Sequence, residues 1–110
     1  MEISEDRIQQ QIFTGHWNDF PEERKLLFMV HNNPRNKIDG AMLKSKGLVA
    51  GVSDLIYLSP REVKSFYLEV KTEKGSQSED QEDWEKLITS LGYCYKVIRS
   101  YDEFKKAVGI

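Results

Sequence analysis

Residues 67–74 read YLEVKTEK, and with Phe66 before them they form the stretch that decides the fold. Side chains alternate across a β-strand, so a strand from Phe66 to Thr72 has two different faces. One face would carry Phe66, Leu68 and Val70, and the other Tyr67, Glu69 and Lys71. The run is apolar enough for a central strand. A strand that looks buried therefore carries a carboxylate and an ammonium group side by side.

The segments around this strand predict a mixed β-sheet flanked by helices. Upstream, residues 51–58 (GVSDLIYL) alternate as a strand, and residues 59–65 (SPREVKS) predict the turn of an antiparallel hairpin. Downstream, Ser78 and Gln81 form a capping-box pattern that opens a helix. Its apolar residues recur at helical spacing, namely Trp84, Leu87, Ile88 and Leu91. Residues 93–98 (YCYKVI) read as a further strand, and this strand-helix-strand order favours a parallel crossover.

The first part of the chain predicts a helix and then a short strand. Glu5, Ile8 and Ile12 lie three and four positions apart, so they share one side of a helix, and an acid shares the apolar face. Residues 26–30 (LLFMV) are a short apolar run, which periodicity alone cannot assign to a strand or to a buried helical turn. We expect a strand.

The remaining segments complete the expected order of elements. Residues 31–40 (HNNPRNKIDG) are rich in Asn and contain Pro and Gly, so they predict a loop. Residues 41–47 (AMLKSKG) predict a short helical turn ending at Gly47. Ser100 and Glu103 repeat the capping pattern and open a terminal helix. We therefore expect an α/β protein with the order α-β-β-β-α-β-α.

Composition limits the class of protein. A chain of 110 residues predicts one domain over residues 1–110, and a formal net charge of −2 argues against binding nucleic acid with the whole surface. The absence of a leader-like start and of a long apolar run predicts a soluble, intracellular and hence cytoplasmic protein. Cys94 predicts a buried, inert thiol. His16 and His31 lack ligand-like partners at short spacing, so we expect no zinc.

Asp54 is a second acidic residue that the fold could bring close to the Glu69 and Lys71 pair. A Glu-x-Lys pair on a strand is common and is by itself consistent with a solvated ion pair. If the hairpin forms, however, Asp54 brings a second carboxylate close to Glu69, and two buried carboxylates resist ionisation without positive charge between them. A divalent cation and the ammonium of Lys71 would supply that charge. Oxygen ligands without His or Cys favour Mg²⁺ or Mn²⁺.

Two further residues agree with such a site, and each has an ordinary alternative. Gln81 lies three residues before Trp84, on the side of the helix that faces the sheet, but it is also the third-position member of the capping box. Glu5 can equally be an acid that is favourable at a helix N-terminus. Glu2, one turn earlier, is the other candidate for an acid from the first helix.

These residues resemble a known family. Asp54 in GVSD, the EVK of residues 69–71 and Gln81 at a helix start, with an acid in the first helix, resemble the core of PD-(D/E)XK nucleases. More narrowly, KSKGLVAGVSDLIYL, YLEVKTEKGSQSEDQEDW and LGYCYKVIRSYDEF are similar to the VRR-NUC branch, including its compact stand-alone members from phages and prophages. Ser53 stands where the superfamily's name has Pro, a position that shapes the turn and carries no chemistry.

The resemblance implies a restriction-endonuclease-like fold and metal-dependent phosphodiester hydrolysis. It implies that Asp54, Glu69 and the backbone carbonyl of Val70 bind Mg²⁺ or Mn²⁺, with Glu5 reaching the ion directly or through water. It further implies that Lys71 orients the attacking water or stabilises charge on the phosphoryl oxygens, and that Gln81 positions Lys71 or the water. Stand-alone VRR-NUC proteins are dimers that act on four-way (Holliday) junctions, so a homodimer on branched DNA is expected.

A cluster of cations precedes the hairpin and is the candidate DNA-binding segment. It comprises Arg35, Lys37, Lys44 and Lys46, opposed only by Asp39. The ordinary alternative is a solvated loop. Two other functions also stay open: a nuclease-fold module that binds nucleic acid without cutting it, and a small protein-interaction domain with a charged surface strand.

Overall fold

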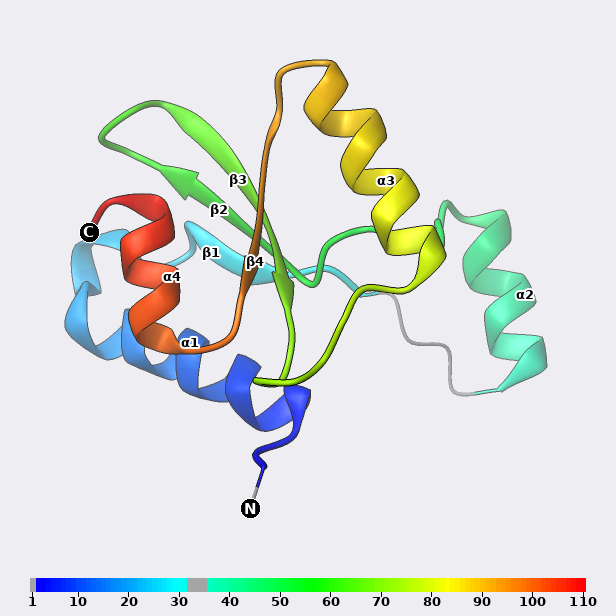
Figure 1. Ribbon diagram of the computed structural model, residues 1–110, viewed down its shortest axis with the longest axis horizontal. Coiled ribbons are helices and arrows are strands. Elements are labelled where there is room, and N and C mark those ends of the chain that lie inside the picture. The colour runs from blue at the N-terminus through cyan, green and yellow to red at the C-terminus, as the bar shows by residue number, and fades with distance from the viewer. Residues whose placement is uncertain (1, 32–35) are drawn as a thin grey trace.

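The computed structural model describes residues 2–31 and 36–110 (Figure 1). Its elements, in chain order, are α1 (Glu5–Asp19), a 3-10 turn η1 (Pro21–Glu23), β1 (Leu27–Met29), α2 (Lys37–Ser45), β2 (Leu55–Ser59), β3 (Lys64–Val70), α3 (Glu79–Ser90), β4 (Cys94–Ile98) and α4 (Tyr101–Val108). None of the helices in the described part of the chain is long and apolar enough to span a membrane.

The strands form one mixed sheet in the order β1-β2-β3-β4. The first three strands pair antiparallel, and β3 pairs parallel with β4. The predicted hairpin, the parallel crossover and the mixed α/β fold are therefore confirmed. The pairing of Leu55 with Leu68 fixes the register of the hairpin and brings the residue before β2 beside Glu69.

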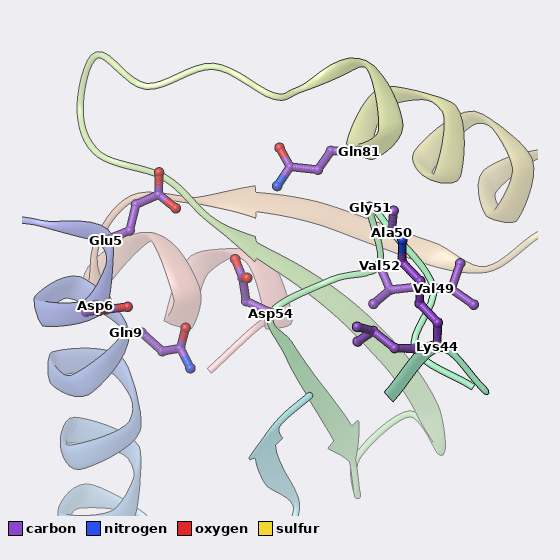
Figure 2. Close-up of a pocket in the computed structure, with 11 residues that line it drawn as sticks. Glu5, Asp6, Gln9, Lys44, Val49, Ala50, Gly51, Val52, Asp54 and Gln81 are labelled. Atoms are coloured by element: carbon purple, nitrogen blue, oxygen red, sulfur yellow. The ribbon is translucent and has the colours of Figure 1, made fainter. Parts of the chain in front are cut away.

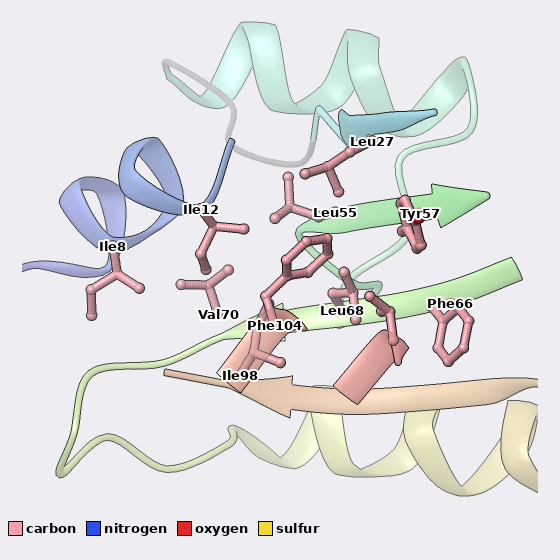
Figure 3. Packing of buried hydrophobic residues seen from close by; sticks show 11 residues of the cluster. Ile8, Ile12, Leu27, Leu55, Tyr57, Phe66, Leu68, Val70, Ile98 and Phe104 are labelled. Atoms are coloured by element: carbon pink, nitrogen blue, oxygen red, sulfur yellow. The ribbon is translucent and has the colours of Figure 1, made fainter. Parts of the chain in front are cut away.

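The apolar face of the sheet packs against α1 and α4, while α3 lies on the opposite side (Figures 1 and 3). The buried cluster takes its members from α1, all four strands and α4: Ile8, Ile12, Leu27, Leu55, Tyr57, Phe66, Leu68, Val70, Ile98, Phe104 and Val108. The alternation predicted for β3 is thus realised, because Phe66, Leu68 and Val70 all enter this core. Tyr67 lies on the other face, where it contacts Trp84 of α3 edge to face.

The helix caps follow the sequence closely. Ser78 and Gln81 form both hydrogen bonds of the capping box, and the Ser100 hydroxyl accepts from the Glu103 N–H. The expected apolar face of α3 is only partly right. Ile88 is buried and Trp84 half-buried, but Leu87 and Leu91 are exposed, so only part of the predicted stripe faces the sheet.

The main correction concerns α2. The expected loop over residues 31–40 is wrong from Lys37 onward. Residues 41–45 of the expected turn over residues 41–47 belong to the same nine-residue helix, with Lys46 as its C-terminal cap. The helix starts early because the Asn36 side chain accepts a hydrogen bond from the Asp39 N–H at 2.8 Å and so caps it. The observed order therefore has one helix more than expected, between β1 and β2.

A buried polar cluster joins η1 to the core. The Glu23 carboxylate binds the His16 ring nitrogen Nε2 at 3.0 Å and accepts from the Tyr57 hydroxyl and the Arg61 guanidinium. Burial raises the pKa of Glu23, but these three partners together outweigh that effect and hold the pKa below its ordinary value. His16 is thus part of the buried polar cluster, whereas Cys94 is half-buried rather than fully buried as predicted.

Candidate active site

Asp54 and Glu69 meet where β2 begins and β3 ends. Asp54 is the residue before β2, and its backbone N–H donates to the Leu68 carbonyl at 3.0 Å, which continues the hairpin by one residue. Its carboxylate oxygen Oδ2 accepts from the Val70 N–H at 2.8 Å. Glu69 lies on the same face of the neighbouring strand and is fully buried. The hairpin register alone therefore brings the two carboxyl groups together.

The environment of Glu69 disfavours its charge. Burial, and after it the neighbouring Asp54 carboxyl group, raise the pKa of Glu69 to about 8, against the smaller opposing effects of Lys71 and Tyr95. Two carboxyl groups in such a position share protons or bind a cation. A strongly raised pKa beside a cavity is also a common property of functional sites.

Lys71 follows β3 directly and is buried. Its Nζ atom lies 3.8 Å from Oε1 of Glu69 and 3.8 Å from Oε2 of Glu5. Its backbone N–H donates to the Ile98 carbonyl at 3.1 Å, so the parallel pairing with β4 fixes the residue in place. The ammonium group is therefore held between a buried carboxylate and one at the start of α1.

The structure distinguishes between the two acids of the N-terminal segment. Glu5 is in the first turn of α1 and contacts Lys71, whereas Glu2 accepts a hydrogen bond from the backbone N–H of Lys74 through Oε1 at 3.3 Å. Glu5 is thus the acid that the fold brings to the paired carboxylates. Its side chain is about half exposed, at 47%.

The side chain of Gln81 makes two contacts, one in the predicted capping box and one with Glu69. Its amide oxygen accepts from the Ser78 N–H at 2.8 Å, which is the capping bond. Its amide nitrogen donates to Oε1 of Glu69 at 2.9 Å. The first turn of α3 is therefore joined to the buried end of β3 through one side chain.

Two polar residues of the site are not among those predicted from the sequence. The Tyr95 hydroxyl of β4 donates to Oε2 of Glu69 at 3.3 Å, and Gln77 donates to the Tyr95 oxygen at 3.0 Å. The pKa of Tyr95 is raised well above its ordinary value, first by burial and then by the Glu69 carboxylate. Alternation in residues 93–98 could have placed Tyr95 on one face of a strand, but only the register with β3 shows that this face points at Glu69.

A cavity of about 360 Å³ opens beside Asp54 and Gln81 (Figure 2). Glu5, Asp6 and Gln9 of α1 line one side, while Lys44 and residues 48–52 line the other, with Asp54 and Gln81 between them. Glu69 is buried behind this lining. The cavity is thus an open, polar cleft beside the paired carboxylates.

Gly51 shapes the wall of the cleft. Its φ angle is +87°, and a Cβ atom there would lie 2.3 Å from the backbone oxygen of Asp80 in α3. Only glycine fits this close approach without moving backbone. The segment between α2 and β2 can therefore lie directly against the first turn of α3, next to Gln81.

The predicted basic segment reaches the cleft at one point. Lys44 of α2 lines the cavity, whereas Lys37 and Lys46 are exposed and do not. Arg35 lies outside the described residues. The fold therefore brings Glu5, Asp54, Glu69, Lys71 and Gln81 together with Lys44, and leaves Lys37 and Lys46 on the surface of α2 and its C-terminal cap.

The oxygen donors of the site suit a hard cation that takes only some of its ligands from the protein. Within residues 2–31 and 36–110, no group of three or more His, Cys, Asp or Glu side chains is placed to hold a metal ion. The side chains on offer are therefore the pair Asp54 and Glu69. A cation such as Mg²⁺ uses one or two carboxylates together with water and substrate oxygens, so a pair of carboxylates matches its usual protein ligands.

A mixed α/β sheet with two carboxylates and a lysine at the end of its central hairpin is consistent with the nuclease-type fold of the PD-(D/E)XK superfamily. The model of the VRR-NUC domain matches residues 3–102, and the chain belongs to this family. A solved structure described as a VRR_NUC domain protein is similar, with a TM-score of 0.70 and 18% sequence identity; the likeness covers 99% of this chain and 88% of that one. At this identity the likeness shows the fold alone. None of the curated proteins matches the chain.

Proposed function

We propose that the protein is a metal-dependent endonuclease that hydrolyses phosphodiester bonds of DNA. The observation that carries this proposal is the meeting of Asp54 and Glu69 beside the cleft, with the Lys71 ammonium 3.8 Å from Glu69. Membership of the VRR-NUC family supports a nuclease-type domain and, with it, DNA as the partner.

Asp54, Glu69 and the backbone carbonyl of Val70 would hold Mg²⁺ or Mn²⁺, with Glu5 adding a ligand directly or through water. When bound, such an ion polarises a phosphate oxygen and lowers the pKa of a coordinated water. The chain prepares its ligands in advance, since the Val70 N–H fixes Asp54 and the Gln81 amide fixes Glu69. Partners of this kind orient metal ligands and tune their basicity.

Lys71 supplies positive charge from the protein itself. Because it is buried and anchored through its backbone, its ammonium group can stabilise the negative charge that builds up on the phosphoryl oxygens without reorganising. Lys44 lines the other wall of the cleft, where it would bind a phosphate beside the one that is cut.

We further propose that the active form is a symmetric homodimer that cuts branched DNA such as a four-way junction. One chain offers one pair of carboxylates and therefore cuts one strand per encounter, whereas a junction has backbones related by two-fold symmetry. A two-fold dimer matches that symmetry and is the commonest oligomer. It would also join two copies of the α2 lysines into a wider positive surface.

The test is a panel of labelled linear duplex, flap, single-stranded and four-way-junction DNAs, each with Mg²⁺, with Mn²⁺ and with EDTA. We expect metal-dependent cleavage, with paired nicks at symmetric positions of the junction and a dimer mass by light scattering. Tight DNA binding without cleavage would make the protein a non-catalytic binding module. The absence of both DNA binding and cleavage would favour a protein-interaction domain. A monomer mass, or single nicks spread equally over linear duplex, would contradict the dimer.

A further inference from the structure

The outer face of α2 is apolar and exposed. Ile38 is 84% exposed and Met42 is 59% exposed, and both line a shallow groove of the helix surface together with Lys37, Ala41 and Ser45. The positions 38, 41, 42 and 45 are three and four apart, so they form a single stripe.

The apolar residues of this helix are not confined to the side that faces the molecule. Its side toward the molecule presents Gly40, which is buried, and Leu43, which is half-buried. A surface helix normally turns its apolar stripe to the core and its polar face to water. In Figure 1, α2 stands at the edge of the molecule, away from α1 and α4. The exposure of Ile38 and Met42 shows that the stripe faces solvent. Such a stripe indicates a binding surface.

Cations border the stripe on the side of the cleft. Lys37 and Lys44 are seven positions apart, two helical turns, and therefore lie on one edge of α2. Lys44 extends into the cleft that holds Asp54, as Figure 2 shows. Lys46, at the C-terminal cap, is on the opposite edge. Lys37 and Lys44 thus border the apolar stripe, and Lys44 also reaches the candidate active site.

We propose that α2 is a wedge that contacts an unstacked base step of DNA beside the phosphate to be cut. This inference rests on the proposed nuclease function and names the residues that select the substrate's shape. An unstacked step offers apolar base faces between two phosphates, and apolar side chains such as Ile and Met are those that proteins insert at such steps. The lysines on the edge of α2 complement the flanking phosphates.

The charges favour DNA over a second protein as the occupant of this stripe. Lysine is depleted in the cores of protein–protein interfaces, whereas here Lys37 lines the same groove as Ile38 and Met42. Unstacking a base costs least where the base is already unpaired or at a discontinuity of the duplex. The wedge would therefore make the protein prefer a branch point to a linear duplex.

The test uses a four-way junction and a matched linear duplex, each with 2-aminopurine at the central step. Lys71→Ala is the parent protein, so that the DNA stays uncut. We expect fluorescence to rise when the parent binds the junction. Ile38→Gln combined with Met42→Gln, both exposed and with a good helix former introduced, should abolish the rise and lower the junction preference by about tenfold, which corresponds to about 1.4 kcal/mol. Leu87→Gln on α3, 58% exposed, is the matched control and should behave as the parent.

Three outcomes would overturn the wedge: no fluorescence change with the parent, an unaltered rise with the double variant, or conversion of a dimer to a monomer by the double variant. The last outcome would assign the stripe to a second copy of the chain. Failure of the nuclease proposal is visible separately. If the fluorescence rises but the protein with Lys71 intact does not cleave DNA, the nuclease proposal fails and the wedge proposal stands. If the protein cleaves DNA but the double variant shows the same fluorescence rise as the parent, the wedge proposal fails and the nuclease proposal stands.

Discussion

Gln81 donates from its side-chain nitrogen to Oε1 of Glu69 at 2.9 Å, while its side-chain oxygen accepts from the backbone of Ser78. A helix cap and a buried carboxylate therefore share one amide group. The cap fixes where α3 begins, and through the same group it fixes which way Glu69 points.

Gln81→Glu separates these two roles. A glutamate keeps an oxygen for the Ser78 N–H, but it replaces the donor to Glu69 by a second carboxylate. We expect turnover to fall by roughly 10- to 100-fold, the range for partners of metal ligands, with little change in the melting temperature. Ser78→Ala is the counterpart, because it should cost about 1 kcal/mol of stability and affect turnover less. Steady-state cleavage and thermal unfolding measure both. Unchanged turnover in Gln81→Glu would leave only the capping role.

Lys71→Ala should lower cleavage by at least roughly 100-fold, as expected for loss of a preorganised charge that stabilises the transition state. Asp54→Ala and Glu69→Ala should do the same, because each removes a proposed metal ligand. All three should keep the fold, as measured by circular dichroism. Lys74→Ala, an exposed lysine three positions after Lys71, is the control and should cut as the wild type does. Robust cleavage by purified Lys71→Ala protein would rule out this mechanism.

Glu69 should make the metal-free protein less stable as the pH rises. Its pKa is about 8 in the folded protein, against an ordinary value of 4.5. Between these values the folded protein keeps a proton that the unfolded chain has lost, so the stability from this group is complete below the lower value and declines toward the higher one. In EDTA, the melting temperature should fall over this range, and less so in Glu69→Gln. Equal slopes for the two proteins would contradict the raised pKa.

Lys44→Ala combined with Lys46→Ala should weaken DNA binding and flatten its dependence on salt. Each phosphate contact contributes about 0.9 to the slope of log K against log salt, so two lost contacts should lower it by about 2. Fluorescence anisotropy at several salt concentrations gives the slope. Lys86→Ala combined with Lys96→Ala removes the same charge from α3 and β4 and is the control. If the slope of the Lys44 and Lys46 variant stayed at the wild-type value, these lysines would not contact phosphate.

Glu23→Ala should destabilise the protein by about 3 kcal/mol, because it leaves His16 and Tyr57 buried without their shared acceptor. Urea unfolding measures this loss. Glu22→Ala, the exposed neighbour in the same turn, should change stability by less than about 0.5 kcal/mol. Equal effects of the two substitutions would mean that the polar cluster around Glu23 adds nothing specific.

The sequence predicts those parts of the site that depend on local pattern. Strand alternation and one hairpin bring Asp54 to Glu69, and the capping box places Gln81 at the start of a helix. Tyr95 could not be predicted in this way, since its role depends on the register of a parallel pair whose strands are separated by a helix. Glu23 is similar, because an acid in a polar segment becomes buried only when Arg61 and Tyr57 close over it.

The start of α2 was missed for a different reason. Asn36 can either continue a turn-rich segment or cap a helix, and its neighbours Asn33 and Pro34 in the sequence favoured the first interpretation. The hydrogen bond from the Asp39 N–H to the Asn36 side-chain oxygen shows that Asn36 caps the helix. The consequence for function was larger than one turn of helix, because the exposed stripe of Ile38 and Met42 exists only if that turn is helical.

Because Gly51 lies so close to Asp80, some positions of the cleft wall tolerate substitution and others do not. Val49 and Ala50 are exposed on the same wall, so larger or charged side chains can be accommodated there without disturbing α3. Position 51 is closed to every other amino acid, because even one methyl group would meet backbone. A library that aims to give this nuclease-type domain a new substrate should therefore vary residues 49 and 50 and keep residue 51 constant.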